Sequence, residues 1–421
     1  MTRTDLINCF LRHRRYRSYL EIGVGIGREN FDRIQCDNKH GIDPAFCVEG
    51  VQHVDSDAFF GENANTFDVI FIDGMHEEPQ VDRDIAHSIR RLNPGGVIIL
   101  HDCLPPDEWH QRPARDYHLG ESWNGTVWKS VLKCFTASEC HCYVVDCDWG
   151  CGVIDTARHA TASPRSDLPL ELDYRRDFWR LEHYVLSEAK FLMEVYDVAV
   201  FYHIAEMGNW EAVVKEHFEI LRAAEIHSVR FSYVGCSDGI DVVGRIAEKA
   251  GIQASLIQFN RELMAYESPA MKMIEEWAGT APETGSILYF HTKGVSAPDD
   301  ENRRKWRKLM NHEVLVNWRQ IVPQLDSFDV IGVNWRNCPP IAHFSGNFWW
   351  ARAGWVRELA PFDEYYANPR HPSALENSPR LGCEFWISSG PRMPQVLSLV
   401  CADQDFVQPV FWSHFSHPAL E

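Results

Sequence analysis

FDVIFIDGMH (residues 67–76) is an apolar run that ends in polar residues, and GGVIILHDC (95–103) repeats this pattern. A third run, EIGVGIG (21–27), opens into closely spaced glycines. In an open parallel α/β sheet the carboxyl ends of the strands form one rim, where residues far apart in sequence converge on a ligand. Asp73 and Asp102, at two of these strand ends, are therefore predicted to share one site.

The composition is that of a large globular protein, with 421 residues of which 45% are apolar and 24% charged. This length exceeds one ordinary core and predicts about two or three domains. The formal net charge of −19 argues against sequence-independent nucleic-acid binding, because a polyanion needs a local excess of Lys and Arg.

The chain holds no apolar run near the roughly 20 residues that cross a bilayer, and residues 1–15 lack the apolar stretch of a signal peptide. We therefore expect a cytoplasmic protein without a transmembrane segment. Thirteen cysteines without a secretion signal suit free thiols better than a disulfide framework. Four of them lie between positions 140 and 151, but without the paired CxxC spacing of zinc knuckles.

Two series of alternating strands and helices are separated by residues 156–172, which are poor in large apolar side chains. Such alternation predicts a mostly parallel, doubly wound sheet in each series. After the boundary, apolar residues recur every three or four positions, which predicts a connecting helix. We expect an α/β domain at 1–155, a linker with this helix at 156–194, and a second α/β domain at 195–421.

The glycine turn of the first domain suits a nucleoside ligand. Gly23 and Gly25 let the backbone approach a ligand without Cβ clashes. Asp43, at the end of the next strand in GIDP, is the kind of acid that holds ribose hydroxyls. The turn alone is a weak signal, because similar turns bind dinucleotides or serve tight packing.

The ordered motifs EIGVGIG, GIDP, FDVIFIDGMH and RRLNPGGVIILHDC resemble the class I S-adenosylmethionine-dependent methyltransferases. Within that class they are most similar to the sugar O-methyltransferases of the macrocin-O-methyltransferase type, over roughly residues 15–155. The resemblance implies a Rossmann-like fold. It also implies that the cofactor S-adenosylmethionine contacts Glu21, Gly23 and Gly25 through its methionine part, Asp43 through its ribose, and Asp57 and Phe59 near its adenine.

The same resemblance implies a divalent metal, magnesium or a similar ion, on Asp73 and Asp102, with His76 as general base. Residue chemistry agrees, because a sugar hydroxyl loses its proton at neutral pH only with help from a base or a metal. Carboxylates are hard oxygen ligands and an imidazole accepts a proton. Asp84 is either a third ligand or a solvated helix acid. Taken singly, an Asp at a strand end is also consistent with a helix cap, and His76 with a histidine that has only a structural role.

In the second series, the order of GSILYFHTKG (285–294), HFSGNFWWAR (343–352) and RLGCEFWIS (380–388) resembles glycosyltransferases of the GT-A fold, over about residues 195–415. The resemblance implies a nucleotide-sugar donor and a glycan acceptor. Asp238 would face the nucleoside. Glu384 would be the general base that removes the proton of the acceptor hydroxyl, although a surface acid at a helix start is the plainer interpretation.

Where GT-A enzymes carry an Asp-x-Asp metal motif, this chain has HTKG, so metal dependence of the second domain is in doubt. Lys293 would supply positive charge to a diphosphate and His291 a further donor. Asn347 and Trp349 combine a polar group with a flat apolar surface, a mix that suits a pyranose ring. Aromatic core packing is the alternative for the tryptophans.

These observations predict an α/β protein with two activities: a metal-assisted sugar O-methyltransferase and a nucleotide-sugar-dependent glycosyltransferase acting on a surface polysaccharide. In one alternative the second domain is a non-catalytic glycan-binding module. In another the first domain methylates a small phenolic or antibiotic-like molecule. The sequence is compatible with a homo-oligomer and does not determine the oligomeric state, the donor sugar or the methylated hydroxyl.

Overall fold

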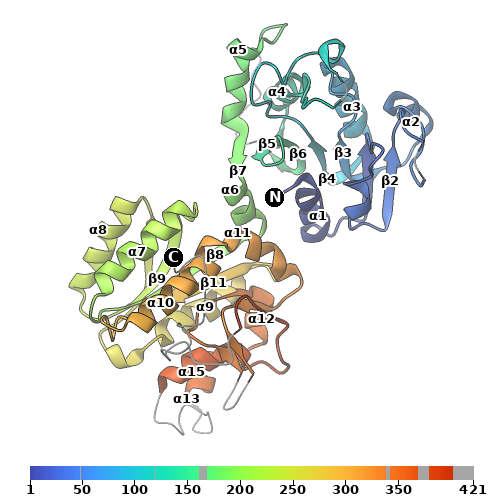
Figure 1. Cartoon of the computed structure of the whole chain (residues 1–421). Coiled ribbons are helices and arrows are strands. Elements are labelled where there is room, and N and C mark those ends of the chain that lie inside the picture. Colours follow the sequence, from blue (N-terminus) through green and yellow to red (C-terminus); the bar gives the residue numbers. More distant parts are fainter. Residues whose placement is uncertain (48, 119, 161–167, 338–341, 368–378, 402–421) are drawn as a thin grey trace. The chain divides into compact units, whose positions relative to one another are not determined.

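The computed structural model of the protein describes residues 1–421 except 48, 119, 161–167, 338–341, 368–378 and 402–421 (Figure 1). The chain divides into two compact units, Met1–Phe191 and Leu192–Glu421, and each holds a seven-stranded sheet. Among the described residues, no helix has both the length and the hydropathy that a membrane span requires.

The sheet of the first unit has the strand order β2-β1-β3-β4-β6-β5-β7. Its parallel strands are β1 (Ser18–Ile22), β2 (Asn38–Ile42), β3 (Phe67–Ile72) and β4 (Leu92–Leu100). β6 (Cys151–His159) runs antiparallel between β4 and β5 (Cys140–Asp146). The chain order reverses between β1 and β3, and open α/β sheets bind ligands at the carboxyl ends of strands beside such a reversal.

Helices cover both faces of this sheet: α1 (Arg3–His13) lies on one side, and α3 (Glu78–Arg91) and α4 (Val127–Ala137) lie on the other (Figure 1). Successive residues of a strand point to opposite faces. Leu20 and Ile22 of β1 accordingly share one core cluster with Val81 of α3 and Trp128 of α4. The short helix α2 (Ser56–Glu62) follows β2, and two 3₁₀ turns lie at Phe31–Arg33 and Ala114–Asp116.

The segment after β6 is not the single connecting helix that we predicted. It contains α5 (Tyr174–Asp177), a 3₁₀ helix (Phe178–Tyr184), β7 (Val185–Ser187) and α6 (Glu188–Val195). β7 pairs in parallel with β5, with Val144 opposite Val185. Its backbone thus forms hydrogen bonds with the edge of β5, which would otherwise be unpaired. The three-residue spacing of Phe178 and Leu181 suits a 3₁₀ helix as well as an α-helix, so the spacing of the apolar residues did not establish a continuous α-helix. Residues 161–167 of the expected linker lie outside the described residues.

The sheet of the second unit has the order β10-β9-β8-β11-β15-β12-β16. Its parallel strands are β8 (Val198–Ala205), β9 (Ser228–Val234), β10 (Gln253–Asn260) and β11 (Ser286–His291). β15 (Trp349–Arg352) runs antiparallel between β11 and β12 (Val330–Gly332), and β16 (Val396–Ser398) closes the edge. β13 (Trp335–Arg336) and β14 (His343–Phe344) pair in antiparallel fashion as a separate two-stranded sheet.

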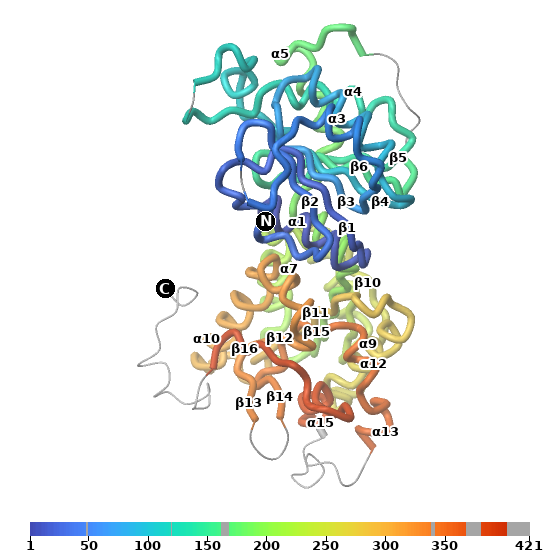
Figure 2. Tube along the Cα trace, turned by 90° about the vertical axis from the view of Figure 1, so that its right-hand side faces the viewer, coloured from blue at the N-terminus to red at the C-terminus, as the bar shows by residue number. Residues whose placement is uncertain are grey.

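The helices of the second unit also form two layers, and Figure 2 shows α10 (Glu301–Met310) and α12 (Ala353–Glu358) on opposite sides of β11 and β15. The other α-helices are α7 (Trp210–Ala223), α8 (Asp238–Ala250), α9 (Ser268–Thr280), α11 (Trp318–Ile321), α13 (Phe362–Ala367) and α15 (Pro379–Phe385). A π-helix spans Asn311–Val316, and 3₁₀ turns span Leu263–Ala265, Val322–Asp326 and Trp386–Ser388. Both units are thus layered α/β structures, each around a seven-stranded sheet, and the predicted α/β class with two successive α/β domains is confirmed.

Candidate functional sites

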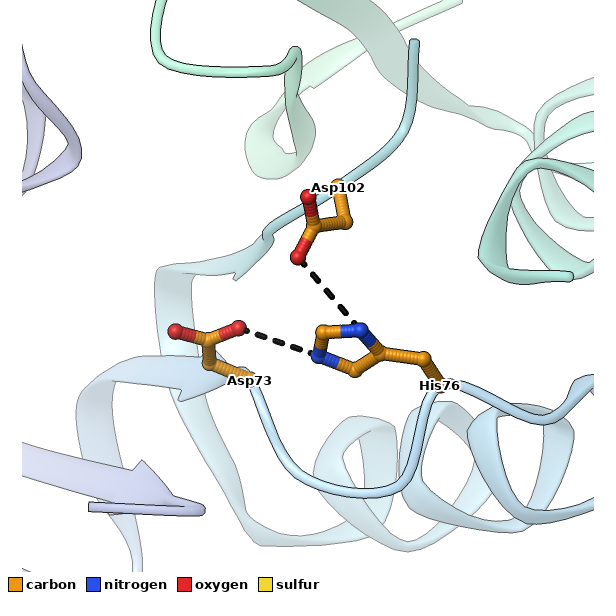
Figure 3. A group of neighbouring side chains, drawn as sticks. All are labelled: Asp73, His76 and Asp102. Atoms are coloured by element: carbon orange, nitrogen blue, oxygen red, sulfur yellow. Dashed lines mark ion pairs between the residues drawn. The ribbon is translucent and has the colours of Figure 1, made fainter. Parts of the chain in front are cut away.

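Three side chains converge at the ends of β3 and β4 in the first unit: Asp73, His76 and Asp102 (Figure 3). Nε2 of His76 lies 3.3 Å from Oδ1 of Asp73, and Nδ1 of His76 lies 3.4 Å from Oδ2 of Asp102. One candidate ligand atom from each residue lies within 4.8 Å of the other two. The three side chains can therefore reach one small cation.

The backbone at Asp102 is held in an unusual conformation, with φ at +60°, which non-glycine residues rarely adopt. The turn is fixed by the amide of Cys103, which donates to the carbonyl of Gly150 at 3.0 Å. Nδ2 of Asn124 donates to Oδ1 of Asp102 at 2.7 Å, so this oxygen is oriented by a neighbour. Strained residues that the surrounding structure holds in place cluster at functional sites.

His101 lies behind the two acids and contacts both. Its Nδ1 is 2.9 Å from Oδ2 of Asp102 and 3.2 Å from Oδ1 of Asp73. Burial disfavours a charged ring, but the acids outweigh burial and raise the pKa of His101 to about 12. Burial likewise opposes ionisation of Asp73, but the neighbouring imidazoles outweigh it and lower the pKa of this carboxyl. Asp73 is therefore kept ionised, as a metal ligand must be.

The residues present fit a divalent cation. The carboxylates of Asp73 and Asp102 supply hard oxygen atoms, which magnesium and related ions prefer. Nδ1 of His76 is buried and makes no hydrogen bond within the described part of the chain, although it lies 3.4 Å from Oδ2 of Asp102, so an ion on that carboxylate would be within its reach. Asp84, the open candidate for a third ligand, lies elsewhere: its buried carboxylate accepts from Ser56 Oγ at 2.5 Å and Gln80 Nε2 at 3.0 Å.

The two glycines of the first turn differ in what surrounds them. Gly23 has φ at +88°, and a Cβ there would lie 2.3 Å from the carbonyl oxygen of Asp73, so packing beside the site requires glycine. Gly25 has φ at +70°, and a Cβ there would meet no atom within 4 Å. The backbone of Gly25 therefore faces open space, as a ligand-binding turn requires.

Asp43 ties this turn to the next loop. Its Oδ2 accepts from the amide of Gly25 at 2.8 Å, and its Oδ1 accepts from the amides of Ala45 at 2.8 Å and Phe46 at 3.0 Å. A carboxylate offers about four lone pairs, so about one remains for a ribose hydroxyl. Glu21, in contrast, is buried and accepts from Tyr19 Oη at 2.6 Å and Asn30 Nδ2 at 3.0 Å.

The two residues predicted to lie near adenine have other partners. Asp57, on α2, pairs with Arg83 at 3.0 Å and His87 at 3.4 Å. Phe59 is 2% exposed and packs in the core, with its ring centroid 5.5 Å from that of Phe60. The prediction for Phe59 was wrong, because a ring enclosed by the core presents no face to a ligand.

A cavity of about 390 Å³ lies beside the carboxyl ends of β8 and β11 in the second unit, and His291, Lys293 and Glu384 all line it. Lys293 is 5% exposed, and its Nζ lies 4.4 Å from the ring centroid of Trp306. Burial lowers the pKa of Lys293. Within the described part of the chain no carboxylate lies within ion-pair distance of this ammonium, whereas Glu384 pairs with Arg380 at 3.5 Å. The cavity thus holds a cation suited to an anionic group.

Asn347 and Trp349 do not line this cavity, and the prediction that they hold a sugar was wrong. Both side chains are fully buried, and Nε1 of Trp349 donates to Oδ1 of Asn347 at 2.8 Å. The reason is that β15 lies inside the sheet, between β11 and β12, where both faces of a strand are covered. Asp238 begins α8, is exposed, and does not line the cavity either.

Sequence reasoning missed Glu267, a second carboxylate of the cavity. It precedes α9 and follows no strand, so no strand-end signal marked it. It also missed Trp306, which comes from α10 and faces Lys293.

Two family models match separate parts of the chain. Residues 21–103 match a model described as a methyltransferase domain, and residues 196–393 match one described as a domain of unknown function. The first match includes the glycine turn and all three members of the Asp73, His76 and Asp102 group. This part of the first unit is therefore similar to a methyltransferase domain. A comparison with curated proteins gave no match.

Several solved structures share part of this architecture. The MycE methyltransferase of the mycinamycin biosynthetic pathway, in complex with Mg and SAH, is 14% identical, with 39% of this chain and 52% of that chain covered and a TM-score of 0.27. This chain thus spans about half of the length of MycE. A protein described as a caffeoyl-CoA O-methyltransferase from Staphylococcus aureus is 18% identical, with coverage of 36% and 82% and a TM-score of 0.28. Mouse xyloside xylosyltransferase 1 is 10% identical, with coverage of 53% and 83% and a TM-score of 0.21. The TM-scores are low, and we draw no conclusion about this protein from these likenesses.

Proposed function

We propose that the first unit is an S-adenosylmethionine-dependent O-methyltransferase that uses a divalent ion and methylates a sugar hydroxyl. The observation that carries this proposal is the group of Asp73, His76 and Asp102, whose ligand atoms lie within 4.8 Å of one another. The group lies at the strand-end rim where the glycine turn of β1 also opens. The methyltransferase-domain match supports the reaction class.

Each side chain has a role in this proposal. Asp73 and Asp102 hold the ion, which when bound lowers the pKa of a coordinated hydroxyl. His76 accepts the hydroxyl proton through Nδ1, which makes no hydrogen bond within the described residues. Asn124 and His101 keep the oxygens of the two acids in place through the hydrogen bonds described above. The open backbone at Gly25 faces the methyl donor.

The test is methyl transfer from labelled S-adenosylmethionine to a panel of polysaccharides, nucleotide sugars and small phenols. We expect transfer to a sugar that excess chelator abolishes and added magnesium restores. Asp73→Asn should lose metal affinity, whereas Asp82→Asn, a control on the surface of α3, should not. Full activity in chelator would remove the metal from the mechanism. Turnover of phenols alone would favour the small-molecule alternative.

For the second unit we propose nucleotide-sugar-dependent transfer of a sugar to a surface polysaccharide, supported by the ammonium of Lys293 in the cavity. Lys293 faces the diphosphate of the donor, His291 contributes to the donor pocket, and Glu384 accepts the proton of the acceptor hydroxyl. Glu384→Gln should abolish sugar transfer and leave donor binding nearly intact. A parent protein that binds glycan but no sugar nucleotide would instead be a glycan-binding module.

A further inference from the structure

Glu267 directs its carboxylate into the cavity of the second unit. It occupies the N-cap position of α9, where an acid ordinarily accepts hydrogen bonds from the first turn, but its side chain makes no such bond. The residue before it, Tyr266, has φ at +48° and ψ at −133°, a conformation that costs energy for a non-glycine residue. Glu267 itself is 4% exposed. The local backbone is thus held so that this carboxylate points inward.

One oxygen of Glu267 is fixed by two buried donors. Tyr289 donates to Oε2 through its hydroxyl at 2.9 Å, and Asn347 donates to the same oxygen through Nδ2 at 2.5 Å. Asn347 is in turn oriented by Trp349. The residues that the sequence suggested as a sugar platform therefore serve to fix Glu267. Its second oxygen, Oε1, lies 3.7 Å from Nδ1 of His291.

The contact made by Nε2 of His291 shows which ring nitrogen carries the proton. Nε2 lies 3.0 Å from the carbonyl oxygen of Gly346, and a carbonyl only accepts, so Nε2 carries a proton. Burial, with the nearby charge of Lys293, lowers the pKa of His291 to about 3, so the ring is neutral. Nδ1 of His291 is consequently an acceptor, 3.7 Å from the carboxylate oxygen Oε1 of Glu267, and within the described residues no hydrogen-bond donor reaches either atom.

Neighbouring hydroxyl groups are the ligand groups that satisfy two adjacent acceptors. We propose that Glu267 Oε1 and His291 Nδ1 bind two adjacent hydroxyls of a sugar, while Lys293 binds a phosphate of the same ligand. All three residues line the one cavity. The identification of that ligand as a nucleotide sugar rests on the proposed function of the second unit, whereas the hydroxyl site rests on the geometry alone.

Calorimetry on the full chain tests this assignment, with nucleoside diphosphates, their sugar conjugates and free glycans as probes. Glu267→Gln should bind sugar conjugates about ten- to hundredfold more weakly, the usual range for a hydrogen bond to a charged group, and should bind the diphosphates alone as the parent does. His291→Gln, which keeps a donor toward Gly346 and removes Nδ1, is a second variant. The control is Glu219→Gln on the exposed surface of α7. Ring ¹⁵N shifts of His291 provide a separate readout, because Nδ1 should shift only when a sugar is present.

The outcomes separate the two proposals. If the parent prefers sugar conjugates and both variants lose that preference, both proposals are supported. If the parent binds no nucleotide but binds a glycan, and the variants lose it, the glycosyltransferase fails and the hydroxyl site stands. If either variant binds the sugar as the parent does, or if the parent binds no sugar of any kind, the hydroxyl site is refuted.

Discussion

Replacing Glu21 by glutamine should change how the stability of the first unit depends on pH. Burial raises the pKa of Glu21 from its ordinary 4.5 to about 7. The folded protein therefore keeps a proton on Glu21 at pH values where the unfolded chain has lost it. This contribution to stability is complete below pH 4.5 and is lost as pH rises toward 7, at about 1.4 kcal/mol per pH unit, or about 3 kcal/mol in all.

Glutamine is nearly the same shape, and its amide oxygen still accepts from Tyr19 and Asn30, but it does not ionise. Hydrogen exchange of the β1 amides, measured in parallel on parent and Glu21→Gln at pH 5 and pH 8, reports the opening free energy of this region. Between these values the parent should lose about 2 to 3 kcal/mol more than the variant. Glu62→Gln, at an exposed position of α2, should follow the parent. A parent-to-variant difference that is the same at both pH values would refute the reasoning.

Three further substitutions test other parts of the structure. Gly25→Ala should leave the first unit folded and weaken S-adenosylhomocysteine binding about tenfold in calorimetry. Gly23→Ala should instead expose the β1 amides to hydrogen exchange, because its Cβ would meet the backbone of Asp73. Equal behaviour of the two variants would contradict this distinction between the glycines. Trp349→Phe leaves an acceptor of Asn347 unpaired and should cost about 1 to 3 kcal/mol, seen as faster exchange along β15; unchanged exchange would show that this hydrogen bond is dispensable. Lys293→Ala should weaken nucleoside diphosphate binding at least about tenfold while methyl transfer is unchanged, and an unaltered affinity would remove Lys293 from the donor site.

The convergence in the first unit could be predicted because the central strands of its sheet are buried on both faces. A strand of this kind is a continuous apolar run in the sequence, and the first polar residue after it marks the rim. Asp73 and Asp102 follow the neighbouring strands β3 and β4, so the pattern placed them together. The orienting contact from Asn124 could not be predicted, because it depends on how a long loop folds back.

The second unit shows where sequence patterns fail. A polar residue beside two tryptophans is equally consistent with a sugar platform and with a satisfied core network, and only the position of β15 inside the sheet decides between them. Glu267 gave no signal, because its direction depends on the backbone angles of Tyr266 and on donors that are far away in sequence. The role of Phe59 near adenine was implied by the resemblance of the ordered motifs, which does not reveal that this ring packs in the core of the first unit.

The loop between Leu104 and Asn124 is secured at both of its ends. At one end the amide of Leu104 donates to Trp149 at 2.9 Å. At the other end the side chain of Asn124 donates a hydrogen bond to Asp102. The backbone carbonyl of His76 accepts a hydrogen bond from the amide of Thr126 at 2.8 Å, and it lies so close to Gly125 that a Cβ would not fit there. Trp123, inside this span, stacks on His76 with ring centroids 5.2 Å apart, so the end of the loop near Asn124 is part of the support of the group of Asp73, His76 and Asp102. A loop graft that aims to change the substrate of the proposed methyltransferase would therefore have to keep Trp123 and Asn124 in place.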